Sequence, residues 1–548
     1  MIDDDPDIRF LPGVPPEDAG VPPFNPRTEH DGTMLIEYDA TVRMRDGVEI
    51  YVDVFRPQGG DPVAPIVAWG PYGKHGAVKY DIFPRHGVDP TWVSRHTGFE
   101  APDPAYWTQH GYAVINVDPR GLWNSQGDAT FYSAQEGRDM YDLIEWAGTQ
   151  PWSNGKVGMS GVSYLAISQW RAAAMQPPHL AAINPWEGVS DRYREMAYHG
   201  GIPEDFFGPM WRNRRVAWSR GQVEDTVSMY AAHPLLDDYW LSKVPDLEKV
   251  EVPAFVVASW SDQGLHTRGT LEGYRRISSK DKWLLVHARK KWQFWHRPDN
   301  VDLLRQFFDR FLLGKPGTMD GWPKVRMEVR ERFYVGEQRD EEAWPLPQTE
   351  PHALYLDAAS GTLVRSPPET AAEVRYDPTV GSATFDHRFT ETTDLIGPMA
   401  LRLWVEAEDA EDMDLFVAVQ KLDEAGDIVS FSFLNAQEDG PVALGWLRVS
   451  HRAVDAERST PLRPWHPHDR EEPLPPGVTV PVDIEIWPSG TRFRAGESLR
   501  LVIQGRDVYE YPPGIVKMAH SKTRNRGTHV IHAGGRHDSH LLVPVIPA

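Results

Sequence analysis

A strand that ends in a tight turn and continues directly into a helix constrains the fold of this chain most. The segment Lys156–Ala166 reads KVGMSGVSYLA; its apolar run breaks at Gly161-Val162-Ser163, and the helix formers of YLAISQWRAAAM follow. Gly161 has no Cβ, which suits the close backbone approach in such a turn. A serine at the start of a helix lies beside unpaired backbone N–H groups. The segment therefore predicts a strained Ser163 that can act as a nucleophile.

This motif leaves two alternatives open. It departs from the pattern G-x-S-x-G, because Leu165 stands where the last glycine is expected. Ser160 also lies two residues after a glycine, Gly158, although within the apolar run rather than at its break. A buried strand-turn-helix with an inert serine has the same pattern. Other parts of the chain must therefore supply further evidence for a site.

Composition excludes several classes of protein. The chain has 548 residues, with 57 Lys and Arg against 79 Asp and Glu, and its net charge of −22 disfavours nucleic acid and anionic membranes as partners. No apolar stretch approaches the roughly 20 residues that span a bilayer, and MIDDDPDIRF has no features of an export signal. The absence of cysteine excludes disulfides and thiolate zinc sites and fits a reducing compartment. We expect a cytoplasmic protein.

The first part of the chain alternates between strands and helices. Residues 1–33 are acidic and rich in proline, which predicts an extended arm on the surface. A β-hairpin is predicted around Asp46-Gly47, and continuous apolar strands follow at PIVAWG, YAVINVD, KVGMSG and PAFVVASW with helical stretches between them. This alternation predicts a mostly parallel sheet covered on both faces. Because Ser163 follows one of its strands, we predict a catalytic domain made of residues 34–181 and 251–316.

Two further regions differ from this pattern. Residues 182–250 are polar, aromatic and helical, which predicts a cap inserted over the substrate; a set of ordinary core helices is the alternative. The stretch Gly314–Gly317 (GKPG) marks a boundary. In residues 317–548, short runs such as MALRLWVEA and SLRLVIQG alternate at period two, which predicts a β-sandwich domain.

Hydrolysis by a serine needs a base, an acid that orients the base, and donors for the oxyanion. Asp262 follows the strand PAFVVASW, where its carboxylate can reach an imidazole across the edge of the sheet; a helix N-cap is its structural alternative. His287 directly follows the strand WLLV and is the favoured base, because a position beside a strand is well fixed. His296, in the same loop, is the alternative base, and His266 is expected on a helix surface.

The oxyanion donors are predicted near two tyrosines. Tyr72 lies in WGPYGKH between Gly70 and Gly73, so its phenol can donate a hydrogen bond opposite the backbone amide of Tyr164. Packing in the core is the alternative role of Tyr72.

Several motifs together resemble one family. The runs MRDGVEIYVDVFRP, GPYGK, VDPRGLWNSQGD, EGRDMYDLIEWAGTQPWSNGKVGMSGVSYLA and GWLRVSHR, in this order, resemble the cocaine esterase and X-Pro dipeptidyl-peptidase (CocE/NonD) hydrolases. The likeness extends from about residue 36 to the end of the chain. It implies an α/β-hydrolase fold with a helical cap and a C-terminal jelly-roll, galactose-binding-like domain.

The resemblance also implies roles for individual residues. Ser163 matches the nucleophile of the family and Asp262 its acid, while Tyr72 and Tyr164 match its side-chain and backbone oxyanion donors. Family members commonly place the base in G-P-W-x-H after the last of these strands, whereas this chain has Lys291 where that histidine is expected. The base is therefore not carried over, and His287 rests on its local position.

We predict a serine hydrolase that cleaves small-molecule carboxylic esters or amides through an acyl-enzyme. An X-Pro dipeptidyl-peptidase or amino-acid ester acylase is one alternative, and an inactive scaffold that binds a partner is another. No cofactor or metal site is expected, because neighbouring C-terminal histidines such as His529 and His532 point to opposite faces of a strand. Whether the chain forms a homo-oligomer is left open.

Overall fold

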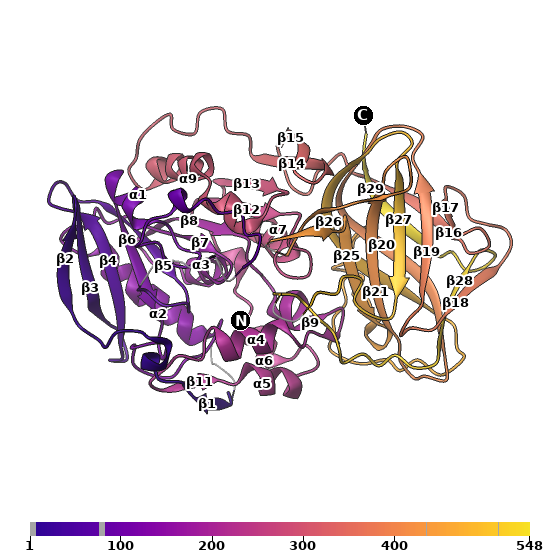
Figure 1. Cartoon of the computed structure of the whole chain (residues 1–548), viewed down its shortest axis with the longest axis horizontal. Helices are drawn as coiled ribbons and strands as arrows, with labels where there is room; N and C mark the ends of the chain where they lie inside the picture. Colours follow the sequence, from indigo (N-terminus) through magenta and orange to yellow (C-terminus); the bar gives the residue numbers. More distant parts are fainter. Residues whose placement is uncertain (1–6, 76–79, 81–82, 435, 513–514, 548) are drawn as a thin grey trace.

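The computed structural model describes residues 7–75, 80, 83–434, 436–512 and 515–547. An N-terminal part of mixed helices and strands, in indigo to pink, lies beside a C-terminal part made of strands, in orange and yellow (Figure 1). One apolar core lies within the C-terminal part, and a larger one fills the N-terminal part and extends to C-terminal residues such as Phe416 and Trp446.

One mainly parallel sheet forms the centre of the N-terminal part. Its strands lie in the order β3 (Met34–Arg43), β4 (Glu49–Pro57), β6 (Tyr112–Asp118), β5 (Ala64–Trp69), β7 (Val157–Val162), β8 (Leu180–Trp186), β12 (Ala254–Ser259) and β13 (Lys282–His287). From β6 to β13 neighbouring strands are parallel. The four predicted apolar runs form β5, β6, β7 and β12, which are buried along their whole length. Such uninterrupted apolar strands fit a sheet that is covered on both faces.

Helices cover the two faces of this sheet. Side chains of α2, α3 and α7 share one core, and side chains of α1 and α9 share another. The helices are α1 (Pro104–Gln109), α2 (Ala134–Gly148), α3 (Tyr164–Ala174), α7 (Thr267–Arg276) and α9 (Pro298–Phe311). Among the described residues, no helix combines the length and the apolarity that a membrane span requires.

The predicted hairpin is confirmed. β3 and β4 are antiparallel, with Arg43 opposite Glu49, and Gly47 in the turn has φ +90°. A positive φ is a conformation that glycine adopts without steric cost, so the Asp-Gly pair suits this turn.

The segment between β8 and β12 consists of short elements. It contains α4 (Phe207–Arg214), β11 (Gln222–Glu224), α5 (Thr226–Ala232) and α6 (Asp238–Ser242). β11 pairs with β1 (Phe10–Pro12) of the N-terminal arm, so the arm contributes a strand as well as extended chain. β8 continues to Trp186, five residues beyond the predicted end of the first catalytic segment at residue 181. The division into domains stays a prediction.

The C-terminal part contains two antiparallel groups of strands. In the first, β20 (Thr393–Glu408) pairs with β26 (Val480–Phe493) on one side and with β28 (Thr528–Ala533) and β29 (His540–Ile546) on the other. In the second, β21 (Asp414–Leu422) pairs with β25 (Ala443–Arg448) and β27 (Ser498–Gln504). Alternate apolar side chains of both groups belong to one buried core. Period-two alternation predicts that each strand has one buried face, because every second side chain of a strand points to the same side.

Candidate active site

Ser163 lies on a strained turn between β7 and α3. Its backbone has φ +59° and ψ −115°, a conformation that costs a residue with a Cβ about 1 to 3 kcal/mol. The Ser163 N–H donates to the carbonyls of Trp186 and Glu187, each at 3.1 Å, and so holds the turn. A Cβ on Gly161 would lie 2.5 Å from Leu165 Cβ and 2.9 Å from the carbonyl oxygen of Glu100. The predicted need for a glycine at this close approach is confirmed.

His266 is the histidine beside this serine. Its Nε2 lies 3.1 Å from the Ser163 hydroxyl oxygen, and its Nδ1 makes a short hydrogen bond with the Asp262 carboxylate. Asp262 follows β12, and its backbone carbonyl accepts hydrogen bonds from the N–H groups of Leu265, His266 and Thr267 at 3.1–3.2 Å. This turn at the start of α7 puts the two side chains on one face, because residues four apart in a helical turn are neighbours.

The expectation that His287 lies within reach of Ser163 and Asp262 is wrong. Its Nε2 lies 3.0 Å from Glu187 Oε1, and its Nδ1 accepts the backbone N–H of Arg289 at 3.1 Å. The ring also stacks on Phe294 at a centroid distance of 3.9 Å. Because Nδ1 accepts a proton donor, Nε2 must carry the ring proton and donate it to Glu187. Both nitrogens are therefore engaged away from Ser163.

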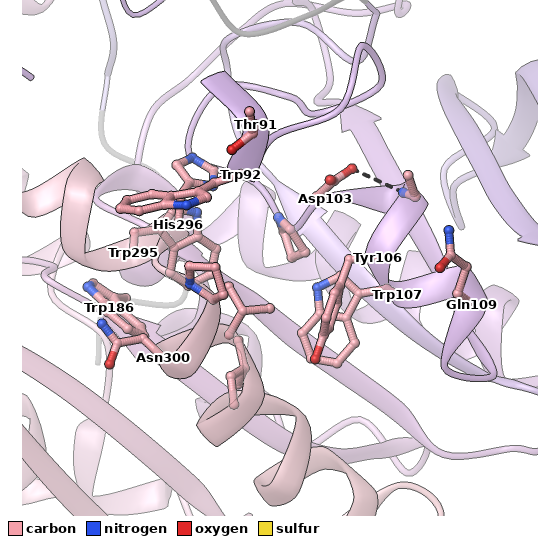
Figure 2. A pocket seen from close by; sticks show the side chains of 15 residues that line it. Thr91, Trp92, Asp103, Tyr106, Trp107, Gln109, Trp186, Trp295, His296 and Asn300 are labelled. Atoms are coloured by element: carbon pink, nitrogen blue, oxygen red, sulfur yellow. Dashed lines mark hydrogen bonds between the residues drawn. The ribbon is translucent and has the colours of Figure 1, made fainter. Parts of the chain in front are cut away.

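The alternative histidine, His296, also lies elsewhere. Its Nε2 accepts a hydrogen bond from the Tyr80 hydroxyl at 2.7 Å, and burial lowers the pKa of His296 to about 3. His296 lines a second cavity of about 320 Å³ together with aromatic side chains that include Trp92, Trp186 and Trp295 (Figure 2). This cavity is larger than the one that Ser163 and His266 line, but neither of these two residues contributes to it.

The expected surface position of His266 is also wrong, since the residue is only 2% exposed. Sequence reasoning missed its role, and it missed the contacts of Lys291. The Lys291 ammonium, from α8 (Lys291–His296), lies 2.6 Å from Asp262 Oδ2 and 2.9 Å from His266 Nδ1. The spacing of four residues between Asp262 and His266 was the one available sequence signal for this arrangement.

Burial and charge together set the protonation of this group. Burial alone would raise the pKa of Asp262, but Lys291 and His266 outweigh it and hold that pKa well below its usual range. Burial, and next the Lys291 charge, lower the pKa of His266 despite the opposing effect of Asp262. The carboxylate is therefore ionised and the imidazole neutral near pH 7. A neutral imidazole at 3.1 Å can accept the hydroxyl proton of Ser163.

Tyr72 and Tyr164, the two predicted oxyanion donors, both lie near Ser163. Tyr72 lines a narrow cavity of about 50 Å³ together with Ser163 and His266, and burial raises the pKa of its phenol well above the usual value. The hydroxyl therefore keeps its proton, and it accepts a long hydrogen bond of 3.4 Å from Trp211 Nε1. Tyr164 opens α3, so its N–H has no carbonyl of the preceding helical turn to bond. Its side chain instead donates to Glu136 at 2.8 Å.

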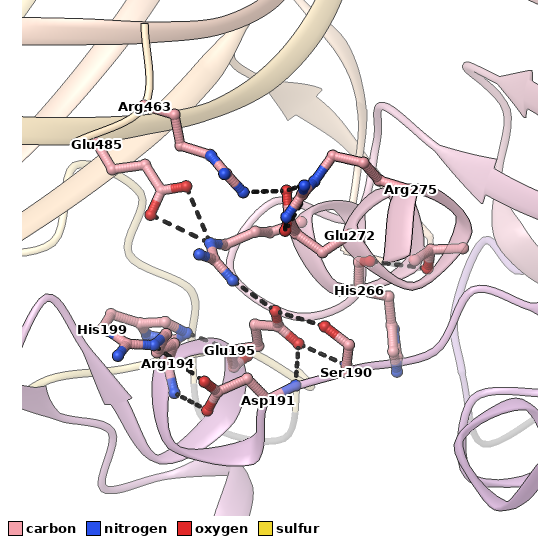
Figure 3. A network of polar contacts seen from close by, with 12 residues as sticks. Ser190, Asp191, Arg194, Glu195, His199, His266, Glu272, Arg275, Arg463 and Glu485 are labelled. Atoms are coloured by element: carbon pink, nitrogen blue, oxygen red, sulfur yellow. Dashed lines mark hydrogen bonds and ion pairs between the residues drawn. The ribbon is translucent and has the colours of Figure 1, made fainter. Parts of the chain in front are cut away.

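A buried network of charges holds α7, which carries His266 at its start. Arg268 donates to Glu195 at 2.7 Å and to Glu485 of β26 at 3.0 Å. Figure 3 labels these two carboxylates. Glu272, one turn later, accepts from Arg463 at 2.7 Å. These pairs tie α7 to the segment after β8 and to the C-terminal part. The histidine is thus held by contacts from regions far apart in the sequence.

One cluster among the described residues has the spacing of a metal site. It consists of Asp39, Asp53 and His75. The Lys74 ammonium lies 2.8 Å from Asp39 Oδ1 and 2.9 Å from Asp118 Oδ2, so a cation of the chain already balances these carboxylates. The C-terminal histidines diverge as predicted: His529 contacts Tyr376, whereas His532 contacts Glu406.

Comparisons with known proteins identify the family of this chain. Residues 46–290 match the model of the X-Pro dipeptidyl-peptidase (S15) family, and residues 317–542 match the model of the X-Pro dipeptidyl-peptidase C-terminal non-catalytic domain. A cocaine esterase from Rhodococcus sp. (strain MB1 Bresler) is 24% identical, with 94% of this chain and 99% of the relative covered.

Solved structures extend these matches. The crystal structure of a CocE/NonD family hydrolase from Staphylococcus aureus is 40% identical, covers 94% of each chain and has a TM-score of 0.91. An α-amino acid ester hydrolase is 16% identical with a TM-score of 0.72, which shows a shared fold. The strained serine and the extent of the S. aureus match lead to one conclusion. The chain belongs to the CocE/NonD family of serine hydrolases.

Proposed function

We propose that this enzyme hydrolyses small carboxylic esters through an acyl-enzyme on Ser163. The observation that carries the proposal is the 3.1 Å contact between the Ser163 hydroxyl and His266 Nε2, with the ionised Asp262 on the opposite ring nitrogen. This is the arrangement of groups that serine acyl transfer needs.

The reaction follows from these contacts. The Ser163 oxygen attacks the ester carbonyl carbon while its proton passes to His266 Nε2, and Asp262 stabilises the resulting imidazolium. Tyr72 and the Tyr164 N–H donate hydrogen bonds to the oxyanion. When the C–O bond to the leaving group breaks, the leaving alkoxide takes the proton from His266. Water then attacks the acyl-enzyme by the same steps, with His266 as base, and releases the acid and free Ser163.

Turnover of p-nitrophenyl esters, together with covalent labelling by a fluorophosphonate, tests this proposal. The cavity beside Ser163 has a volume of about 50 Å³, which at roughly 10 to 15 Å³ for each water-sized group has room for only a few such groups and so suits short acyl chains. We therefore expect p-nitrophenyl acetate to react faster than long-chain esters. A folded enzyme that neither turns over these esters nor takes up the label would support the inactive-scaffold alternative instead.

Tyr72 gives a separate prediction. Tyr72→Phe removes one hydroxyl donor but keeps the ring, which packs edge-on against Phe99 at a centroid distance of 5.0 Å. We expect kcat to fall by about 10² to 10³ with KM nearly unchanged, since an oxyanion donor acts in the transition state. Steady-state kinetics on p-nitrophenyl acetate measure this. A kcat equal to that of the unmodified enzyme would mean that Tyr72 serves only to pack the cavity.

A second candidate function is the hydrolysis of amino-acid esters. Glu100 lines the same cavity, and burial raises the pKa of its carboxyl group to about 7. One oxygen accepts from Trp292 Nε1 at 2.9 Å, while the other is buried with no hydrogen-bond partner among the described residues. A substrate ammonium would provide that partner and favour the ionised carboxylate.

Glu100→Gln tests this candidate. The substitution keeps the side-chain shape and the acceptor for Trp292 but removes the charge. If Glu100 binds an ammonium, the variant should lose at least about tenfold in kcat/KM for alanine p-nitrophenyl ester relative to p-nitrophenyl acetate. Equal losses on the two substrates would assign Glu100 a structural role.

We further infer that the C-terminal part has jelly-roll topology and that the protein works in the cytoplasm. The order of the C-terminal motifs supports the first inference, and the lack of cysteine is compatible with the second.

A further inference from the structure

The Lys291 ammonium contacts both Asp262 and His266, the two residues proposed to activate Ser163. Its side chain is 2% exposed, and its ammonium lies 2.6 Å from Asp262 Oδ2 and 2.9 Å from His266 Nδ1. A buried ammonium is costly to desolvate, so its retention here needs compensating carboxylates.

Three carboxyl groups provide this compensation. Asp262, Glu187 and Glu100 all raise the pKa of Lys291, which lies above its usual value although burial opposes this. Glu187 follows β8 and Glu100 precedes α1, so the acids converge from separate elements. His287 has no ring nitrogen directed at Lys291, because its Nδ1 accepts the Arg289 N–H and its Nε2 lies against Glu187.

The remaining polar groups at the cavity do not replace Lys291. Tyr72 stays neutral, since burial raises the pKa of its phenol. Arg215 also lines the cavity, and its guanidinium lies over the ring of Phe83 at 5.2 Å. Lys291, by contrast, touches the Asp262–His266 pair directly.

The geometry at Nδ1 also restricts how Lys291 can bond. An ammonium has only donors, so it can bond to Nδ1 only if that nitrogen has no proton. The ring proton would then sit on Nε2, and Nε2 could not accept the proton of Ser163. The reactive arrangement therefore requires Asp262 Oδ2 to accept from both Lys291 and His266. In that arrangement the ammonium lies beside the ring and opposes its protonation.

We propose that Lys291 is a positioning residue whose ammonium balances these acids and so keeps His266 in its neutral, proton-accepting form near pH 7. The inference rests on the proposed role of His266 as the base. Without the cation, Asp262 and Glu187 would favour the imidazolium, which cannot accept a proton from Ser163.

The pH dependence of kcat/KM for p-nitrophenyl acetate tests this inference, because its acid limb reports the base of the free enzyme. For the unmodified enzyme we expect the limb below pH 6.5, since burial and Lys291 lower the pKa of His266. Lys291→Gln keeps a donor for Asp262 but removes the charge. Its limb should move up by about 1 to 2 pH units, so that activity is low at pH 7 and recovers at alkaline pH. Lys291→Arg keeps the charge and should keep the limb.

Glu187→Gln provides a second test that leaves Lys291 in place. Removing this negative charge should move the acid limb downward, because Glu187 raises the pKa of His266. The rate of fluorophosphonate labelling against pH should show both shifts. A folded Lys291→Gln enzyme whose acid limb is unshifted or lowered would overturn the inference. If the lysine variant does not fold, an acid limb that is unshifted or raised in Glu187→Gln would overturn it. An unmodified enzyme without esterase activity or labelling would instead refute the proposed function.

Discussion

Ser163→Ala should lower kcat for p-nitrophenyl acetate by about five to six orders of magnitude and abolish fluorophosphonate labelling. The substitution removes the oxygen that forms the acyl-enzyme. The N–H of residue 163 still bonds to the carbonyls of Trp186 and Glu187, so the turn should keep its shape. Circular dichroism and the melting temperature should therefore stay close to those of the unmodified protein.

Ser160→Ala is the matched control, because this serine lies in β7, three residues before Ser163. Its hydroxyl donates to Asn184 Oδ1 at 3.0 Å and is buried, so its loss should cost about 1 kcal/mol of stability. Labelling and turnover should remain. Should Ser163→Ala retain most of its turnover while Ser160→Ala loses it, the nucleophile has been assigned to the wrong serine.

The sheet and the nucleophile were predictable because their signals are local. A strand buried on both faces must be apolar along its length, and β5, β6, β7 and β12 each read as such a run. The turn at Ser163 needs a residue without a Cβ two positions earlier, and Gly161 is visible in the sequence. Asp262 could be proposed because it follows a buried strand at the edge where parallel strands end.

The histidine could not be predicted in this way. His266 lies in HTRGTLEGYRRI, which reads as an ordinary helix with a polar face. Whether His266 faces solvent or Ser163 depends on where α7 lies against β7. Contacts between residues far apart in the sequence, such as those of Arg268 with Glu195 and Glu485, set that position. His287 was favoured because it follows a strand directly. At that position the side chain meets Glu187 instead, which follows β8, two strands away in the sheet.

The C-terminal strands show the same limit. Period-two alternation identifies β20 and β26 individually, but their pairing joins Leu403 to Val482 across a long stretch of sequence. Alternation carries no information about which strand becomes the neighbour. The resemblance to a family implied one topology for these strands. It did not assign the base, because this chain has Lys291 where the family commonly has a histidine.

His266→Ala should abolish the acylation burst on p-nitrophenyl acetate and lower kcat by about four to six orders of magnitude. The imidazole takes the Ser163 proton in the first step and returns it to the leaving group, so its removal stops both transfers. Stopped-flow absorbance in the first turnover measures the burst directly. The variant should bind substrate with little change, because His266 acts mainly in the transition state.

His287→Gln and His296→Gln are the controls that separate this assignment from the positions favoured by sequence. Glutamine at position 287 can still donate to Glu187, and glutamine at position 296 can still accept from Tyr80, so both variants should fold and keep a measurable burst. The 3.1 Å contact with Ser163 belongs to His266 alone among the three histidines. A burst that survives His266→Ala but disappears in His287→Gln would show that His287, at the end of β13, supplies the base.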